Sequence, residues 1–465
     1  MDNVVAVGPR LDRLPVTRKT RILVAVVGVG LFFDLYEVFL TGTLANALKR
    51  DFALDGSQVA LVLASVWIGA FFGALSLSRV ADRIGRRRAF FLTLAIYSVF
   101  SIVAAFSVNV EMLIICRFIA GIGIGAEPPL CDSYLSDMVP AAKRGRLTAW
   151  AYTFAFCAIP LTGLLAIHLG GGTLFGIDGW RIMFLLGGLG ALVCWVLRTR
   201  LPESPRWLES VGRREEADRI VSEFEASAVA EGKTLAEVDT SVVVDERPSR
   251  FVELFSRPLR KRTTMMWIFH TLSTVVYYGF GTLAPLALAA KGFDVVQSAV
   301  FTTLIFVGYP IGSSLTVFIV DRVERRTLLF GSLLVLAVVG YLFGTSTSAP
   351  AIIAFGFVYT AVSNGFSNFF HIYQAEIYPT RLRATGAGSA YSLSRLTTAF
   401  MPFALLPLLY SGGATLMFTA IAATACVLAV VVRALGPRVT GAGLESINDE
   451  GPAADSVLTK EDTAR

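Results

Sequence analysis

Asp82-Arg83-Ile84-Gly85-Arg86-Arg87 is repeated in the second half of the chain as Asp321-Arg322-Val323-Glu324-Arg325-Arg326, a segment with nearly the same order of charges. A second pair of segments is separated by the same number of residues, because Asp137-Met138-Val139-Pro140 aligns with Glu376-Ile377-Tyr378-Pro379. Two loops that match at one register indicate an internal duplication. The repeated loops therefore predict two related halves.

Long apolar stretches separate these charged loops. The chain of 465 residues is 54% hydrophobic and only 16% charged, with a mean hydropathy of +0.64, which is too apolar for a soluble protein of this length. A helix of ~20 apolar residues crosses a bilayer, and such windows recur from Arg21 to Arg433. We predict an all-α membrane protein with twelve transmembrane helices in two pseudo-symmetric six-helix bundles. The predicted spans are 21–47, 58–79, 89–108, 111–136, 146–170, 180–198, 265–290, 297–320, 327–346, 350–375, 384–411 and 413–433.

The distribution of basic residues predicts the orientation. Arginines and lysines follow the second, fourth, eighth and tenth spans, whereas the loops on the other side hold few. Because cytoplasmic loops retain Lys and Arg, both termini are expected in the cytoplasm, and the protein in a bacterial-type inner (plasma) membrane. The predicted order is a cytoplasmic N-terminus (1–20), an N-terminal bundle (21–198), a cytoplasmic linker (199–262), a C-terminal bundle (263–435) and a cytoplasmic, disordered tail (436–465).

Several function classes are disfavoured by the sequence. The five cysteines lie in apolar stretches without paired spacing, so we expect neither disulfides nor a metal site. No Walker loop or nucleophile elbow occurs, so we predict no enzyme activity, no ATP-driven transport and no cofactor. The net charge of +6 is typical of cytoplasmic loops and predicts no nucleic-acid partner. The expected partners of a monomeric protein are the bilayer, protons and a small-molecule substrate.

Together these motifs resemble the major facilitator superfamily over residues 20–435. The Asp-Arg-x-Gly-Arg-Arg loop is the hallmark of that superfamily. The segments 117–127, 202–208 and 376–380 look like its branch of sugar porters and organic-ion or metabolite:proton transporters. The seventh span (Trp267-Ile268-Phe269-His270-Thr271-Leu272-Ser273) lacks the Gln-rich pattern of sugar porters, which disfavours a sugar substrate. The resemblance implies secondary active transport.

Charged residues inside the spans are candidates for proton coupling. Asp34 and Glu37 lie about one turn apart in the first span, and Arg117 in the fourth span is their expected partner. Two carboxylates that share one guanidinium leave one acid able to accept a proton. The resemblance points the same way, because proton symporters of this type use a first-span acid with this arginine. A permanent structural ion pair is the alternative, and the spacing does not decide which acid titrates.

Other residues are predicted to bind the substrate. Glu127 precedes Pro128 and Pro129, which should break the helix, so we expect Glu127 to line a cavity beside unwound backbone. Arg395 lies about eleven residues into the eleventh span, near the membrane midplane, where it suits a substrate carboxylate or phosphate. The alternative is that Arg395 pairs with Glu127 or another first-half acid. Further candidates for substrate contacts are Tyr391, Asn364, Asn368, Tyr277 and Tyr278.

The repeated cytoplasmic loops predict a conformational latch. The positive-inside rule explains the arginines but not the recurring acids, and Arg–carboxylate contacts can form in one conformation and break in another. The alternative is that these loops carry charges only because they are cytoplasmic, without forming a latch. The predicted latch residues are Asp82, Arg83, Arg86, Asp137, Arg144, Asp321, Arg322, Glu376 and Arg383.

The function best supported by the sequence is proton-coupled symport of a small organic acid or related polar metabolite by alternating access. A proton-driven efflux antiporter, or a sugar or organic-cation carrier, is possible on the same fold. A membrane sensor without transport activity would need a large soluble output domain, and the linker and tail are too short and polar for one.

Overall fold

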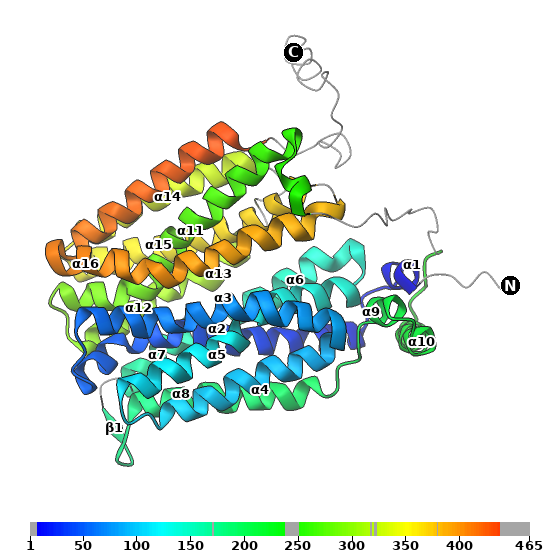
Figure 1. Ribbon diagram of the computed structural model, residues 1–465, viewed down its shortest axis with the longest axis horizontal. Helices are drawn as coiled ribbons and strands as arrows, with labels where there is room; N and C mark the ends of the chain where they lie inside the picture. Colours follow the sequence, from blue (N-terminus) through cyan, green and yellow to red (C-terminus); the bar gives the residue numbers. More distant parts are fainter. Residues whose placement is uncertain are drawn as a thin grey trace, which may run out of the picture.

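The computed structural model describes residues 7–169, 172–237, 251–316, 319, 323–378 and 380–437. Nearly all of the secondary structure in this part is α-helical, and the helices pack side by side in two bundles (Figure 1). The N-terminal bundle contains α2 (Arg18–Asp51), α3 (Gly56–Ile84), α4 (Arg86–Ala105), α5 (Val110–Met138), α6 (Ala141–Phe156), α7 (Ala158–Leu169) and α8 (Gly179–Arg198). The C-terminal bundle contains α11 (Arg257–Ala290), α12 (Val295–Phe306), α13 (Gly308–Thr316), α14 (Arg325–Thr345), α15 (Ala349–Glu376) and α16 (Thr380–Leu435).

Short elements lie at the two ends of the bundles. Helices α1 (Val7–Asp12), α9 (Pro205–Ser210) and α10 (Arg214–Ala230) lie at one end, which we call the linker end. The 3-10 helix η1 (Phe251–Phe255) precedes α11. At the opposite end, called the hairpin end, strands β1 (Thr173–Leu174) and β2 (Ile177–Asp178) form an antiparallel hairpin (Figure 1).

The helices confirm the twelve predicted spans. Within the described ranges, ten helical segments are long and apolar enough to cross a membrane, and α6–α7 and α12–α13 each count as one of them. Helix α16 of 56 residues holds two spans, which meet at Gly413, where φ is 69°. Helix α5, with 29 residues, is long enough to be the remaining span, and it carries Arg117, Glu127 and Asp132. The first span is longer than predicted, because Thr17 caps α2 at Arg18 and the helix runs on to Asp51.

Two spans, one in each bundle, are broken close to a proline. Helix α6 ends at Phe156, four residues before Pro160, and α12 ends at Phe306, four residues before Pro310. A proline has no N–H to donate to the carbonyl four residues earlier, so the helical ladder is interrupted there. The predicted spans 146–170 and 297–320 are therefore each two short helices, and α7 packs against α12 across the two bundles.

Glycines hold α3 and α5 at close range. A Cβ atom on Gly69 would lie 1.9 Å from the carbonyl oxygen of Phe118, and one on Gly73 would lie 1.9 Å from that of Ile122. From the other helix, a Cβ on Gly125 would lie 2.1 Å from the carbonyl oxygen of Ala70. Small residues of this kind allow the backbones of membrane helices to touch. The Gly-lined contact fixes α5, with its charged residues, against α3.

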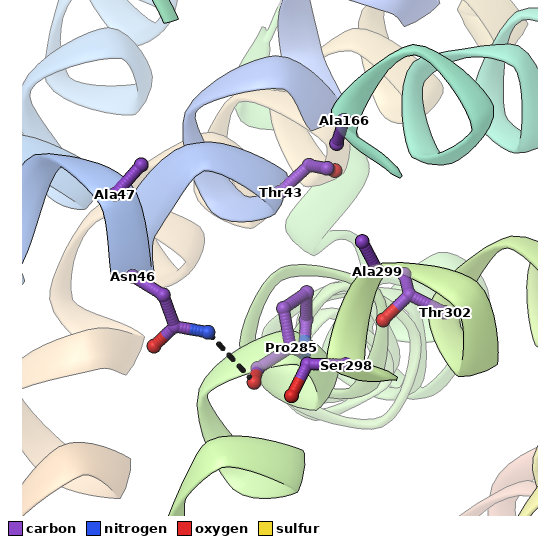
Figure 2. Close-up of a pocket in the computed structure, with 8 residues that line it drawn as sticks. All are labelled: Thr43, Asn46, Ala47, Ala166, Pro285, Ser298, Ala299 and Thr302. Carbon is purple, nitrogen blue, oxygen red and sulfur yellow. Dashed lines mark hydrogen bonds between the residues drawn. The ribbon is translucent and has the colours of Figure 1, made fainter. Parts of the chain in front are cut away.

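The two bundles meet tightly at the hairpin end. Asn46 Nδ2 on α2 donates a 3.0 Å hydrogen bond to the carbonyl oxygen of Pro285 on α11 (Figure 2). A Cβ atom on Gly42 of α2 would lie 2.9 Å from the carbonyl oxygen of Thr282 on α11. The small pocket in Figure 2 encloses about 10 Å³, roughly the space that one water molecule needs. These contacts hold α2 and α11 close together at the hairpin end.

Candidate functional site

Among the described residues, six charged side chains are buried between the helices, in addition to His270. Three are acids and three are arginines: Asp34, Glu37, Glu127, Arg117, Arg198 and Arg395. A charge inside a membrane protein is costly unless it is paired or borders water. The equal numbers of the two signs make the set electrically neutral when every acid is ionised.

Glu37 and Arg117 form a closed ion pair. Nη1 of Arg117 lies 2.6 Å from Oε2 of Glu37, and Nη2 donates a 3.0 Å hydrogen bond to the backbone carbonyl of Glu37. The guanidinium also lies 5.2 Å from the ring centroid of Phe184. Both charged side chains are 0% exposed. Arg117 thus pairs with Glu37 as predicted, but the expectation that it also pairs with Asp34 is wrong. The pair is sealed in this conformation, which agrees with the alternative of a structural ion pair.

Glu127 forms a second closed ion pair, with Arg198 at the end of α8, and both side chains are 0% exposed. Thr93 Oγ1 donates a 2.9 Å hydrogen bond to Oε2 of Glu127, and the guanidinium of Arg198 lies 4.0 Å from the ring centroid of Phe90. The expectation that Glu127 lines a cavity is therefore wrong, as is its alternative pairing with Arg395. Arg198 satisfies Glu127 from within the same bundle.

The backbone next to Glu127 also differs from the prediction. Pro128 and Pro129 lie inside the continuous helix α5, without an unwound segment. Inside a membrane protein, neighbouring helices and side chains can satisfy the backbone groups that a proline leaves free, so the helix continues.

Asp34 is the third buried acid, and it belongs to neither ion pair. Its side chain is buried, with 2% of the residue exposed, and its Oδ1 atom has no hydrogen-bond partner. Among the described residues, no basic side chain forms an ion pair with Asp34. Its carboxylate nevertheless lies within electrostatic range of Arg395 and Arg198. Asp34 follows Gly30 by one helical turn, so it lies on the face of α2 that approaches Arg198.

Arg395 is the corresponding arginine on the other bundle. It is 5% exposed, it donates a hydrogen bond to the hydroxyl of Tyr391, and no acid within the described ranges forms an ion pair with it. Its guanidinium lies 5.3 Å from the ring centroid of Trp67 on α3 and 4.6 Å from that of Tyr391. The rings of Trp67 and Tyr278 meet edge to face at 4.6 Å. Arg395 therefore lies in an aromatic cage built by both bundles.

The other residues that were predicted to bind the substrate belong to α11 and α15 of the C-terminal bundle. Tyr277 packs edge to face on Tyr278 at 4.9 Å and donates a 3.4 Å hydrogen bond to Oδ1 of Asn364. The amide of Asn364 donates to the carbonyl of Tyr309 at 2.8 Å, and that of Asn368 donates to Thr316 Oγ1 at 2.8 Å. Both asparagines are thus engaged within their own bundle. Tyr278 and Tyr391 are the predicted residues nearest to Arg395.

The predicted latch is partly described. Arg86 Nε lies 3.8 Å from Oδ2 of Asp137, which also accepts a 2.7 Å hydrogen bond from Ser204. Arg144 Nη2 lies 3.5 Å from Oδ1 of Asp12, the last residue of α1, and Arg83 is exposed. These contacts join parts of the N-terminal half. The side chains of Asp82, Asp321, Arg322, Glu376 and Arg383 lie outside the described residues.

Three residues of the site were not singled out by the sequence. Arg198 ends a span, where the positive-inside rule already accounts for an arginine. Trp67 is one apolar residue among many in its span. Glu203, whose Oε1 accepts hydrogen bonds from the backbone N–H groups of Arg86 and Arg87 at the start of α4, belongs to a recognised segment, but its partner depends on the fold. The sequence offered one hint that Arg198 is buried. Arg198 ends an apolar span, and the first span contains glycines that allow a close approach.

Comparison with known proteins agrees with this architecture. The sequence profile of the family "Sugar (and other) transporter" matches residues 23–450. The chain is 29% identical to the niacin transporter NiaP of Acinetobacter baylyi, over 94% of this chain and 98% of that protein. It is 27% identical to the 4-hydroxybenzoate transporter PcaK of the same organism, over 84% and 85%.

Among solved structures, the xylose transporter XylE from Escherichia coli in a partially occluded inward-open conformation superposes with a TM-score of 0.72. The match covers 91% of this chain and 98% of XylE at 21% identity, and it shows the fold. The match of the family profile over most of the chain is the basis for assigning the chain to a family. The chain belongs to the sugar (and other) transporter family, a group of multi-pass membrane transporters with the major facilitator fold.

Proposed function

We propose that this transporter carries a small organic acid together with a proton. One observation carries the proposal. In the described part of the chain, Asp34 is the buried acid and Arg395 the buried arginine that lack an ion-pair partner, and they lie on different bundles within electrostatic range of each other. An acid that can take up a proton thus faces a guanidinium that can bind an anion.

Charge balance couples the two events. The pairs Glu37–Arg117 and Glu127–Arg198 are closed and neutral, so the net charge of the site depends on Asp34 and Arg395. A substrate carboxylate on Arg395 while Asp34 is ionised would leave one uncompensated negative charge inside the membrane. A proton on Asp34 without the substrate would leave one uncompensated positive charge. Because buried unpaired charge is costly, the site favours binding one proton with one carboxylate.

The surroundings of Arg395 favour an aromatic acid. A guanidinium can bind a carboxylate through two parallel hydrogen bonds, and Nε of Arg395 has no hydrogen-bond partner. Trp67, Tyr278 and Tyr391 offer ring faces and edges to a flat substrate. The relatives named for niacin and 4-hydroxybenzoate support the same class, since both compounds are aromatic carboxylic acids. We therefore take an aromatic monocarboxylate as the substrate class.

Transport follows from movement of the two bundles. The site residues come from both bundles, and at the hairpin end Asn46 of one bundle donates a hydrogen bond to Pro285 of the other. In the proposed orientation the linker end faces the cytoplasm, the hairpin end faces outward, and both termini are cytoplasmic in the inner membrane of the cell. Arg86, Asp137 and Arg144 then belong to a cytoplasmic latch, and the monomer is the transporting unit.

Uptake by proteoliposomes tests the proposal. Labelled nicotinate, 4-hydroxybenzoate, succinate, xylose and tetraethylammonium are supplied with the outside acidic, at equal pH, and under a potassium–valinomycin potential. We expect uptake of the aromatic acids to be stimulated by the pH gradient and unchanged by the potential, because a proton and a carboxylate together carry no charge. Liposomes without protein correct for passive entry of the weak acids. Uptake of only the sugar or the cation, or aromatic-acid uptake indifferent to the pH gradient, would overturn the proposal.

A further inference from the structure

Two loops of the N-terminal bundle expose large apolar side chains at the hairpin end. The first loop joins α4 to α5 and exposes Phe106 and Val108, the latter at 80%. The second is the β-hairpin between α7 and α8, which exposes Leu174 and Ile177, and Phe175 at 93%. We call these five residues the apolar rim. Figure 1 shows that the hairpin projects sideways from the ends of the helices and does not continue along them.

Arg181, near the start of α8, joins the two loops. Its Nε donates a 3.0 Å hydrogen bond to Oδ2 of Asp178, the last residue of β2. Its Nη1 donates hydrogen bonds of 2.9 and 2.8 Å to the carbonyl oxygens of Ala105 and Ser107. One guanidinium thus binds the base of the hairpin and the middle of the α4–α5 loop. The two parts of the apolar rim are therefore neighbours on the same bundle.

The duplicated half of the chain shows that the fold does not require an apolar rim. Moved along the chain by the spacing that relates the two repeated charged loops, Phe106-Ser107-Val108-Asn109 corresponds to Thr345-Ser346-Thr347-Ser348. These segments connect equivalent helices, α4 to α5 in one half and α14 to α15 in the other. Lys291, which follows α11 at the hairpin end, donates a 2.7 Å hydrogen bond to the carbonyl oxygen of Ser346. Both loops thus lie at the same end, and the apolar side chains are particular to the N-terminal bundle.

The turn of the hairpin carries its phenylalanine at a conformational cost. The two central residues, Phe175 and Gly176, have φ values of 55° and 78°. Positive φ at both central positions of a two-residue turn favours Asn, Asp and Gly, because a larger side chain is strained there. At 93% exposure, Phe175 also gains little from contact with the rest of the protein. A strained and exposed aromatic side chain indicates a contact with something outside the chain.

The bilayer is the partner that fits this surface. Helices α4 and α8 pack against each other and expose Val99, Leu186 and Leu189, which face lipid in a spanning bundle. The apolar rim lies at the ends of these helices and continues their apolar surface. The sequence holds no charged residue from Gly172 to Ile177, so entry of the tip into lipid moves no charge out of water. Phe and Leu side chains bind at the boundary between headgroups and acyl chains.

We propose that the apolar rim is an interfacial anchor, a surface that inserts into the headgroup–acyl boundary of the bilayer at the hairpin end. Because withdrawal of apolar side chains from lipid into water costs free energy, the anchor fixes the depth of α4 and α8 in the membrane. The C-terminal bundle, with its polar loop, has no such restraint at the equivalent place. This role does not depend on the substrate and goes beyond the proposed function.

The test measures the depth of a fluorophore on the hairpin. Thr173→Cys, at an exposed polar position of β1, is labelled with bimane after Cys157→Ser and Cys426→Ser remove the exposed thiols. The full chain is reconstituted in phosphatidylcholine vesicles with nitroxides on the lipid headgroup or near the end of the acyl chain. Iodide is the aqueous quencher. We expect the headgroup nitroxide to quench more strongly than the deep nitroxide, and iodide to quench weakly.

Matched variants identify the side chain responsible. Phe175→Asn removes the apolar group but favours the positive φ of the turn, so the hairpin is kept. We expect headgroup quenching to fall by about twofold or more and iodide quenching to rise, because the apolar contact with lipid is lost. Phe175→Trp should keep the quenching of the parent protein. A fluorophore at Glu215→Cys, on an exposed position of α10 at the linker end, is the aqueous control and should be quenched strongly by iodide.

Two results would overturn the anchor. The first is strong iodide quenching with weak lipid quenching on the hairpin of the parent protein, or equal quenching in Phe175→Asn. The second is a fluorophore that neither quencher reaches, with energy transfer between labelled copies that rises with the protein-to-lipid ratio. That result would assign the rim to a contact between copies of the chain. No transport is measured, so these outcomes leave the proposed function untouched.

Discussion

A Cβ atom on Gly30 of α2 would lie 2.0 Å from Nη2 of Arg198, so α2 can lie against the buried guanidinium only because residue 30 has no side chain. The same approach places Asp34, one turn further along α2, beside the closed pair of Arg198 and Glu127. Gly30 thereby links the acid proposed to carry the proton to the ion pair that fixes its surroundings.

Gly30→Ala is expected to displace Arg198 and break its ion pair with Glu127. Separation of a buried pair leaves uncompensated charges, which costs about 3–5 kcal/mol. We expect a lower midpoint of thermal unfolding in detergent. Gly331→Ala on α14 is the matched control, because a Cβ atom there meets nothing within 4 Å. Equal unfolding midpoints for the two variants would show that Arg198 can move aside without lowering the stability of the protein.

Asp34→Asn removes the acid that is proposed to bind the proton. We expect exchange of labelled for unlabelled substrate to continue, because the substrate can still bind Arg395 and cross. Accumulation driven by a pH gradient should be lost, since no proton accompanies the substrate. Uptake with and without the gradient measures the difference. Accumulation at the wild-type level would transfer the proton-binding role to Glu37.

Arg395→Lys keeps the positive charge but loses the planar fork that binds a carboxylate through two hydrogen bonds. We expect the KM for aromatic acids to rise by about tenfold or more, and uptake to vanish in Arg395→Ala. The measurement is the initial rate of uptake against substrate concentration. Wild-type kinetics in Arg395→Ala would remove Arg395 from the site.

The sealed pair of Glu37 and Arg117 should behave as a structural unit. Glu37→Gln and Arg117→Gln should each lower the free energy of unfolding by about 3–5 kcal/mol, because each leaves its partner charged and unpaired. The double variant, which has no buried charge at this place, should recover part of that loss. Chemical unfolding of the four proteins gives the coupling energy. Additive losses would indicate that the two side chains do not depend on each other.

The N-terminal segment should respond to pH at the linker end. Glu225 on α10 accepts hydrogen bonds from Arg10 of α1 and from Arg13, each with an oxygen–nitrogen distance of 2.7 Å. Although burial raises the pKa of Glu225, these hydrogen bonds outweigh it, and the pKa lies below its ordinary value. The stabilisation is therefore complete above the ordinary carboxyl pKa and is lost as the pH falls through the lowered value.

Hydrogen exchange of the α1 amides measures this contact. Protection should persist from neutral pH to just below pH ~4.3, the ordinary pKa of a glutamate, and then fall. Glu225→Gln should reduce the protection at neutral pH as well. Glu215→Gln is the control, because this exposed residue lies in the first turn of the same helix and has no resolved contact with α1. Protection unaffected by both acid and Glu225→Gln would show that the charges do not hold the segment.

The sequence predicts the membrane-spanning helices well because the length of an apolar stretch is set by the thickness of the bilayer. The orientation that the basic loops indicate stays a prediction. Asp34, Glu37, Arg117 and Arg395 stand out for the same reason, since charge is rare at that depth. What the sequence could not settle is which charges pair. The reach of Arg198 to Glu127 depends on the approach of α2 at Gly30, and that packing exists only in three dimensions.

The glycine contacts between α3 and α5 have a mechanical consequence. Trp67 on α3 lies 5.3 Å from the guanidinium of Arg395, and α5 carries Arg117 and Glu127, so we expect these three side chains of the N-terminal bundle to keep their relative positions. Opening of the hairpin end must then come from bending of other helices. The interruptions after Phe156 and Phe306, where a proline has removed a backbone hydrogen bond, provide two hinges that face each other.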